Sequence, residues 1–237
     1  MLIDAGLSCA ETQRRLQAIQ ADLSTIRAVC VSHEHDDHKA SLGVLQRRHA
    51  VELYANSGTI QGLEESDRFQ GLKWNVFSNG SPFQVGDLQV EAFSVPHDSY
   101  DPVGFAVSCG AVRVGLVTDM GMPTELIRQR LRHCHVVIVE ANHDERLLRD
   151  AARPWSLKQR ISGRQGHLSN AQAAQLVRDV AGPLLRTVFL AHLSAECNRP
   201  DLALRSVREA LQQGGHSAVD VKVTYPDRVS ELVVVEG

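Results

Sequence analysis

The stretch VSHEHDDHKA, residues 31–40, carries most of the titratable chemistry of the sequence at one place. Three histidines and three acids occupy six consecutive positions, directly after an apolar run. Alternate residues of an extended segment share a face, so His33 and His35 can point the same way. Asp37 and His38 can then reach a second point a few ångströms away. Imidazoles and carboxylates bind zinc, and they also suit iron or manganese, whereas a solvated charged turn is the alternative interpretation.

Three further ligand-type residues each follow an apolar run that resembles a strand. They are His97, Asp119 and His192. One metal needs about four ligands, and two metals need about seven if one ligand bridges them. A lone histidine after a strand is usually structural. Three such positions, together with the H-x-H-x-D-H stretch, favour a metal site over coincidence.

Short apolar runs that could be strands alternate with helical patterns along the chain. The predicted strands cover residues 2–4, 27–32, 51–55, 88–95, 104–109, 112–118, 135–141, 187–193, 221–225 and 231–236. The predicted helices cover residues 9–20, 42–49, 122–134, 144–153, 170–181 and 199–214. Helices gather near both ends and strands dominate the middle. We therefore expect an α/β fold with two packed sheets and helices outside, rather than a doubly wound parallel sheet.

The composition excludes several classes of protein. The chain has 237 residues, 43% hydrophobic content and a net charge of −3. No apolar stretch approaches the roughly 18 residues of a membrane span, and the N-terminus is not a signal peptide. We therefore expect no membrane association and a cytoplasmic location. The five scattered cysteines form no C-x-x-C, which argues against a disulfide framework and against a cysteine zinc site.

Arginine dominates the basic residues, and one cluster of them could bind phosphates. Residues 144–164 hold six basic residues against three acidic ones. Arginine matches phosphate oxygens with two parallel hydrogen bonds, so we expect Arg160 and Arg164 to bind substrate. A solvated helix face with carboxylate partners is the alternative.

The ordered set of ligand-type residues resembles the metallo-β-lactamase superfamily over nearly the whole chain. The resemblance implies an αββα four-layer sandwich with a two-metal site at one edge of its sheets. It also implies two divalent cations, zinc first, with manganese or iron as alternatives. Carried over by residue, the resemblance assigns the first metal to His33, His35 and His97, the second to Asp37, His38 and His192, and the bridging position to Asp119.

The bridging aspartate, in place of a cysteine, is typical of the hydrolase and nuclease side of that superfamily. Stretches such as LIDAGLSCAETQRRL, PHDSYDPVGFAV, EANHD and LAHLSAECN look like the YycJ/WalJ-type metallo-hydrolases. That resemblance implies a 5′-to-3′ exonuclease that acts on DNA in repair, with a hydroxide held between the metals as the nucleophile. DNA is favoured over RNA as the nucleic-acid partner.

Two residues are expected to be catalytic. Asp37 is expected to be essential as a ligand of the second metal. The stretch GHLSNAQAA resembles tRNase Z, which implies that His167 acts on the oxygen leaving the scissile phosphate. Glu140 is expected to orient His167 or a metal ligand, and Asp4 to fix the metal-binding loop by hydrogen bonds. His143 is as well explained by holding a loop together.

The family pattern differs from this sequence at the N-terminus. Related chains carry about one more strand pair before LIDAG, whereas this sequence begins at Met1. We therefore expect a single domain over residues 1–237 that lacks the first N-terminal strands of the family. An uncovered sheet edge would favour pairing between copies, so a homodimer is a candidate assembly.

Two other functions compete with the nuclease. A small-molecule thioesterase of the glyoxalase II type would use the same metals to polarise a carbonyl. A catalytically idle scaffold that binds nucleic acid or a repair partner would need no metals, and in this sequence no ligand is missing. The arginine cluster favours the nuclease, because a thioesterase has no need of a phosphate-lined groove.

Overall fold

The structure is a computed structural model, and it describes residues 1–235 of the chain. The chain divides into two compact units. Unit 1 comprises Met1–Ser94 and Ser99–Val103, and unit 2 comprises Val95–Asp98 and the described chain from Gly104 onward. The expectation of a single, N-terminally shortened domain over residues 1–237 stays a prediction.

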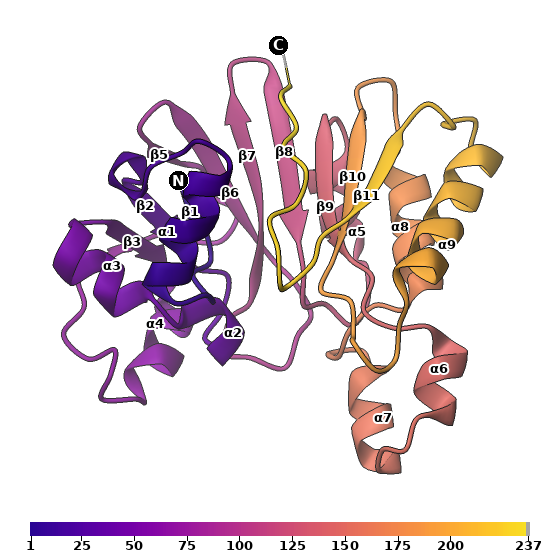
Figure 1. The fold of residues 1–237 in the computed structure, drawn as a ribbon, viewed down its shortest axis with the longest axis horizontal. Coiled ribbons are helices and arrows are strands. Elements are labelled where there is room, and N and C mark those ends of the chain that lie inside the picture. The colour runs from indigo at the N-terminus through magenta and orange to yellow at the C-terminus, as the bar shows by residue number, and fades with distance from the viewer. Residues whose placement is uncertain (236–237) are drawn as a thin grey trace. The chain divides into compact units, whose positions relative to one another are not determined.

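Unit 1 contains a parallel sheet with the strand order β1-β2-β3-β4 (Figure 1). Its strands are β1 (Leu2–Ile3), β2 (Ala28–Cys30), β3 (Glu52–Ala55) and β4 (Trp74–Val76). Parallel neighbours need crossover connections, and these contain helical segments. The segments are α1 (Cys9–Ala18), the 3-10 helix η1 (Leu23–Thr25), α2 (Asp36–Lys39), α3 (Leu42–His49) and α4 (Ser57–Glu64). An antiparallel hairpin of β5 (Phe83–Val85) and β6 (Leu88–Ser94) also belongs to unit 1.

The hydrophobic core of unit 1 fixes the position of β2 and of the loop that follows it. All three residues of β2 are buried, as expected of an interior strand in a parallel sheet. Val29 pairs with Leu53 of β3, and Leu42 and Leu45 of α3 pack in the same core. The polar residues that follow β2 therefore start from a fixed point.

Unit 2 contains a sheet with the strand order β11-β10-β9-β8-β7. Its strands are β7 (Val103–Cys109), β8 (Val112–Val117), β9 (Val136–Glu140), β10 (Thr187–Ala191) and β11 (Asp220–Val223). The first two form the predicted antiparallel hairpin, which turns at Gly110 with a φ of 55°. The remaining pairs are parallel, so β8, β9 and β10 all end at the same edge of the sheet.

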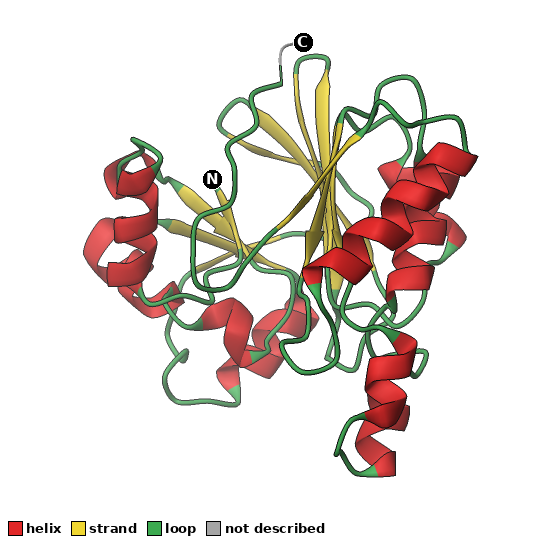
Figure 2. Ribbon diagram, turned by 45° about the vertical axis from the view of Figure 1, so that its right-hand side comes forward, coloured by secondary structure: helices red, strands yellow, loops and turns green. Residues whose placement is uncertain are grey.

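The helices of unit 2 are α5 (Glu125–Leu131), α6 (Glu145–Asp150), α7 (Trp155–Ile161), α8 (Asn170–Val180) and α9 (Pro200–Gln213). Helix α8 begins at the predicted capping box of Ser169 and Gln172. Helices α8 and α9 pack against each other. Helices α6 and α7 project together, apart from the other helices of this unit, and we call residues 145–161 the α6–α7 arm (Figures 1 and 2).

Several predicted elements differ from the structure. Helices α2, α4 and α7 and the short strands β4 and β5 were not predicted. The predicted helix over residues 144–153 ends at Asp150, because Pro154 separates it from α7. The predicted strand over residues 231–236 is wrong for residues 231–235, and residue 236 lies outside the described part. No helix within residues 1–235 is long and apolar enough to cross a membrane.

Candidate metal centre

In unit 1 the H-x-H-x-D-H stretch brings three imidazole rings together. The ring of His33 lies 4.6 Å from that of His35 and 4.1 Å from that of His38, measured between centroids. His33 and His38 are buried, whereas the side chain of Asp37 is 63% exposed. The Nε2 atom of His38 lies 3.6 Å from Oδ2 of Asp37, so these two ligand-type atoms face a common point.

Asp4 holds this loop from the end of β1. Its carboxylate accepts hydrogen bonds from the backbone N–H and the hydroxyl of Ser32, at 2.7 and 2.8 Å. It also lies 2.8 Å from Nδ1 of His38. The hydroxyl of Ser32 lies 2.9 Å from Nδ1 of His33 and can accept a hydrogen bond from Nδ1–H. The predicted role of Asp4 is confirmed, whereas the role of Ser32 was missed.

Gly6 allows the same N-terminal segment to brace α2. The N–H of Ala5 donates to the carbonyl of His38 at 2.8 Å. A Cβ at Gly6 would lie 1.6 Å from the carbonyl oxygen of Asp37, so no side chain fits there. The chain from Asp4 to Gly6 therefore fixes the backbone that carries Asp37 and His38.

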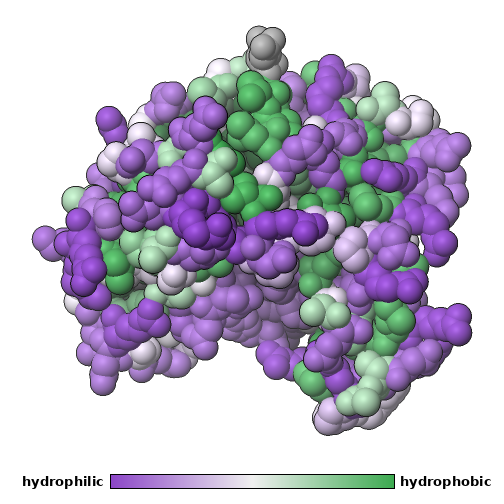
Figure 3. All heavy atoms as spheres, viewed as in Figure 1, coloured by the Kyte–Doolittle hydropathy of each residue, from purple (hydrophilic) through white to green (hydrophobic). Residues whose placement is uncertain are grey.

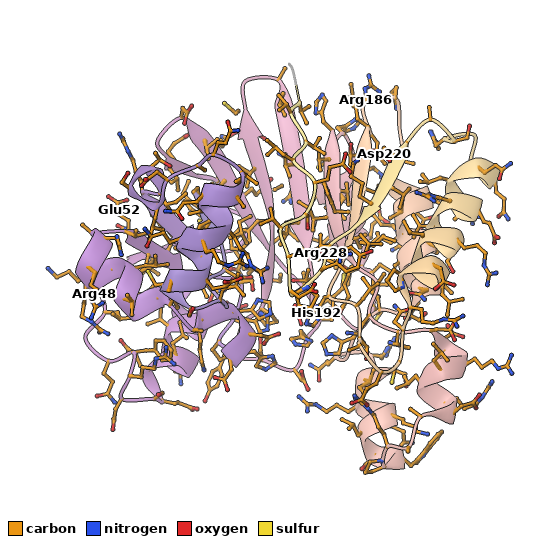
Figure 4. The ribbon with its side chains drawn as sticks, viewed as in Figure 1. Arg48, Glu52, Arg186, His192, Asp220 and Arg228 are labelled. Atoms are coloured by element: carbon orange, nitrogen blue, oxygen red, sulfur yellow. The ribbon has the colours of Figure 1, made fainter. Side chains whose placement is uncertain are left out.

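In unit 2 the ligand-type residues come from separate elements. His97 follows β6, Asp119 follows β8, and His192 follows β10, where Figure 4 labels it. Oδ1 of Asp119 lies 3.3 Å from Nδ1 of His192 and 4.0 Å from Nε2 of His97. Asp119 is buried. These three residues, each of which follows a strand, therefore lie close together in unit 2.

Asp4 in unit 1 and Asp119 and His192 in unit 2 have a left-handed backbone that non-glycine residues seldom adopt. The φ angles are 61° at Asp4, 55° at Asp119 and 57° at His192. Each follows the end of a strand, where the chain must turn sharply away from the sheet. Such strain persists only where the surroundings over-determine the backbone, and it gathers at functional sites.

Glu140 lies beneath two histidines of unit 2 and binds both. Its Oε1 lies 2.7 Å from Nδ1 of His167 and 2.8 Å from Nδ1 of His192. Its Oε2 accepts the backbone N–H groups of Met120 and Leu168, at 3.1 and 3.3 Å. Glu140 is fully buried, at the end of β9. Glu140 therefore contacts both His167 and His192, the residue expected to ligate metal.

The charges of these groups follow from their contacts. Burial alone would raise the pKa of Glu140, but the hydrogen bonds from His167 and His192 outweigh burial, so its pKa is lowered. Burial also opposes the charge of His167, yet the bond to Glu140 raises the pKa of His167 above its usual range. At His97 burial dominates and lowers the pKa, which favours the neutral imidazole that binds metals.

The histidines fit a metal site because their Nδ1 atoms are held by other groups. His38 faces Asp4, and His167 and His192 face Glu140. His97 can donate Nδ1–H to the carbonyl of Gly166 at 3.1 Å. A histidine held in this way offers Nε2 as its electron-pair donor, as metal-binding histidines commonly do. Within unit 2, ligand-type atoms of Asp119, Glu140, His167 and His192 lie within 4.8 Å of one another.

His143 holds a loop, as one of its two interpretations expected. Its carbonyl accepts the N–H of Asn170 at 2.8 Å, and it forms an isolated bridge with Ser169. This backbone contact joins the loop after β9 to the start of α8.

The arginine cluster is partly neutralised by acids far away in the sequence. Arg160 donates to Asp98 at 2.5 Å, and Arg153 donates to Glu196 at 2.7 Å. Arg164 is exposed. Arg160 thus contacts the residue next to His97, so one of the two arginines predicted to bind phosphate lies near the ligand-type residues of unit 2.

A cavity of about 300 Å³ opens beside His167 and His192 in unit 2. Leu157, Arg160 and Ile161 line it from one face of α7. The cavity therefore combines apolar walls with a guanidinium group next to the histidines, which suits a substrate that has both an apolar and an anionic part.

Comparison with known proteins defines the class. The beta-lactamase superfamily domain matches residues 1–193. The chain is 32% identical to Exodeoxyribonuclease YycJ of Bacillus anthracis, over 99% of this chain and 90% of that protein. It is also 32% identical to Exodeoxyribonuclease WalJ of Streptococcus pneumoniae, with the same coverage.

Two solved structures agree in fold. The metallo-beta-lactamase fold protein YhfI from Bacillus subtilis has a TM-score of 0.69 at 16% identity, covering 94% of this chain and 82% of that one. Zn(2+)-bound PqqB from Methylobacterium extorquens has a TM-score of 0.68 at 18% identity, covering 98% and 82%. The predicted αββα fold class is confirmed, and the protein is a hydrolase of the metallo-β-lactamase fold. The chain belongs to the β-lactamase superfamily and, within it, to the family of the YycJ and WalJ exodeoxyribonucleases.

Proposed function

We propose that this protein is a metal-dependent 5′-to-3′ exonuclease that hydrolyses the phosphodiester bonds of DNA during repair. The names of its relatives YycJ and WalJ support the exonuclease activity and the choice of DNA over RNA. A cytoplasmic location and a homodimer stay predictions.

Seven residues would hold two divalent cations in this proposal. His33, His35 and His97 would hold the first cation, Asp37, His38 and His192 would hold the second, and Asp119 would contribute to both. Nitrogen and carboxylate donors suit zinc, and manganese or iron would also accept them. When bound, the two cations would activate a water for attack on phosphorus and offset the charge that develops there.

The observation that carries the proposal is the pair of hydrogen bonds from His167 and His192 to Glu140. One buried carboxylate, that of Glu140, thereby orients both His192, which would bind metal, and His167, which would act on the substrate. His192 is oriented to bind, and His167 is oriented toward the cavity that both residues line.

His167 would act on the leaving group. Hydrolysis breaks the bond between phosphorus and the 3′ oxygen, and that oxygen needs a proton as it leaves. The contact with Glu140 raises the pKa of His167, so His167 can carry that proton. Arg160 would exchange Asp98 for a phosphate, and Arg164 would hold a phosphate further along the strand.

The direct test is hydrolysis of 5′-labelled DNA with and without a chelator. We expect labelled mononucleotides to be released from the 5′ end, and we expect the chelator to abolish their release. The Arg160→Ala and Arg164→Ala double variant should need higher DNA concentrations for the same rate. Metal-dependent thioester hydrolysis without any cleavage of DNA would overturn the proposal.

A further inference from the structure

The α6–α7 arm carries an exposed tryptophan that hydrolysis does not use. Trp155 is the first residue of α7, and 66% of its surface is exposed. Figure 3 shows hydrophobic and hydrophilic residues side by side on this arm. Tryptophan is enriched at binding surfaces, because it offers a large, rigid contact area. An exposed ring on a projecting arm therefore indicates a contact with a partner.

A cavity of about 240 Å³ lies beside this ring, on the side of α7 away from Leu157 and Ile161. Trp155 and Leu148 supply apolar walls, and Lys158 and Gln159 supply polar groups at its edge. A nucleobase has two apolar faces and a polar edge, so its chemistry matches this lining.

His143 gives an independent indication of a ligand. It lines the same cavity and is 1% exposed. Its Nδ1 has no hydrogen-bond partner among residues 1–235. Buried polar atoms in proteins nearly always have partners, so this atom points to a polar group that enters the cavity.

Three charged side chains line the cavity, Arg149, Lys158 and Glu145, so two cations meet one acid there and the balance favours a nucleic acid over a protein. The side chains of Arg146 and Arg149 are 82% and 68% exposed, and they meet Asp150 only at 3.7 and 3.5 Å. Such long, exposed contacts hold weakly, so a phosphate can replace the carboxylate. Lys158 lines the cavity too, and its ammonium group donates to the carbonyl of Arg149 at 2.5 Å, a neutral acceptor that a phosphate can replace.

We propose that the α6–α7 arm binds single-stranded DNA, with one base stacked on Trp155 in this cavity. Lys158 and Arg149 hold the neighbouring phosphates, and Nδ1 of His143 meets the polar edge of the base. The strand must be single, because a paired base cannot present its face to the ring. The choice of DNA rests on the proposed function, whereas the stacking and the phosphate contacts do not.

Fluorescence of Trp155 tests the stacking directly. The chain has two tryptophans, so Trp74→Phe leaves Trp155 as the only one. Nε1 of Trp74 has no hydrogen-bond partner among the described residues, so phenylalanine removes none. This variant is titrated with an oligothymidylate of about 12 nucleotides in the presence of a chelator, which prevents hydrolysis. We expect saturable quenching, and we expect none with an abasic oligomer of the same length.

Variants of the arm separate stacking from charge. Trp155→Phe should weaken binding less than Trp155→Leu, and we expect Trp155→Leu to lose roughly tenfold in affinity. Lys158→Ala should reduce the salt dependence of binding by about one counterion.

The outcomes distinguish this inference from the proposed function. Equal quenching by the abasic oligomer, or unchanged affinity in Trp155→Leu, would overturn the inference while hydrolysis of DNA could still be measured. Quenching without any hydrolysis in the presence of metals would overturn the proposed function alone. Unchanged fluorescence with every oligonucleotide would overturn the inference and leave the arm as a surface for another protein.

Discussion

The two units supply their ligand-type residues in different ways. In unit 1 they come from one loop of six residues, His33 to His38, and Asp4 supports them through one histidine and Ser32. In unit 2 they come from the ends of separate strands, and Glu140 supports two histidines and two backbone N–H groups. The loop of unit 1 is supported by the partly exposed carboxylate of Asp4. The ligand-type residues of unit 2 are supported by the fully buried carboxylate of Glu140, which contacts four N–H groups or ring nitrogens.

Removal of a ligand should have the largest effect. Asp37→Ala should lose one metal and nearly all nuclease activity, because Asp37 and His38 face the same point. Glu34→Ala should do much less, since Glu34 binds the N–H of Tyr100 instead. Activity and metal content of both variants are measured together. Equal damage from both would mean that the assignment of alternate residues in this loop is wrong.

Loss of Glu140 should have the next largest effect. Glu140→Ala leaves His167 and His192 without their acceptor and two backbone N–H groups without a partner. We expect kcat/KM to fall about 100-fold, which is the upper end of the range of losses measured when groups that orient metal ligands are removed. Glu140→Gln is the matched control, because it keeps the shape and one oxygen acceptor. An unchanged kcat/KM of Glu140→Ala would contradict the role proposed for this carboxylate.

Asp4→Ala should cost about tenfold in activity, because only one histidine loses its acceptor. The measurement is kcat/KM over a range of added metal, in which a weakened site is partly restored by excess metal. A loss larger than that of Glu140→Ala would reverse the comparison between the two units.

Replacement of Glu11 should have the smallest effect. It tests whether the burial of a carboxylate decides how much its removal costs. Glu11 binds Arg14 and Arg15 at 2.6 Å each, as Glu140 binds two histidines, but its side chain on α1 is 30% exposed. The hydrogen bond from Arg14, followed by that from Arg15, lowers the pKa of Glu11 to about 2.

The stabilisation from Glu11 is present above its ordinary pKa and is lost as pH falls toward about 2. Water screens exposed ion pairs, so Glu11→Ala should keep its activity and lower Tm by only a small amount at pH 7. A Tm loss as large as that of Glu140→Ala would contradict this ranking.

The candidate ligands could be selected from the sequence because residue type and strand ends are local features. His97, Asp119 and His192 each follow an apolar run, and parallel strands end at one edge of a sheet. The capping box at Ser169 is equally local and was predicted for the same reason. These features depend on residue types within a few positions of one another.

Features that depend on residues far apart in the sequence could not be predicted from local patterns. The partners of Arg153 and Arg160 are Glu196 and Asp98, which lie 43 and 62 positions away along the chain. No pattern in residues 144–164 predicts these ion pairs. The cavity beside Trp155 depends on Pro154, which separates two helices that fold back on each other.

Metal stoichiometry tests the central claim most directly. Elemental analysis of the purified protein should find about two equivalents of divalent metal per chain, as a two-metal hydrolase requires. His192→Ala should hold close to one equivalent, because the ligands of the first metal remain. Less than one equivalent in the unmodified protein, under conditions in which it hydrolyses DNA, would contradict the account.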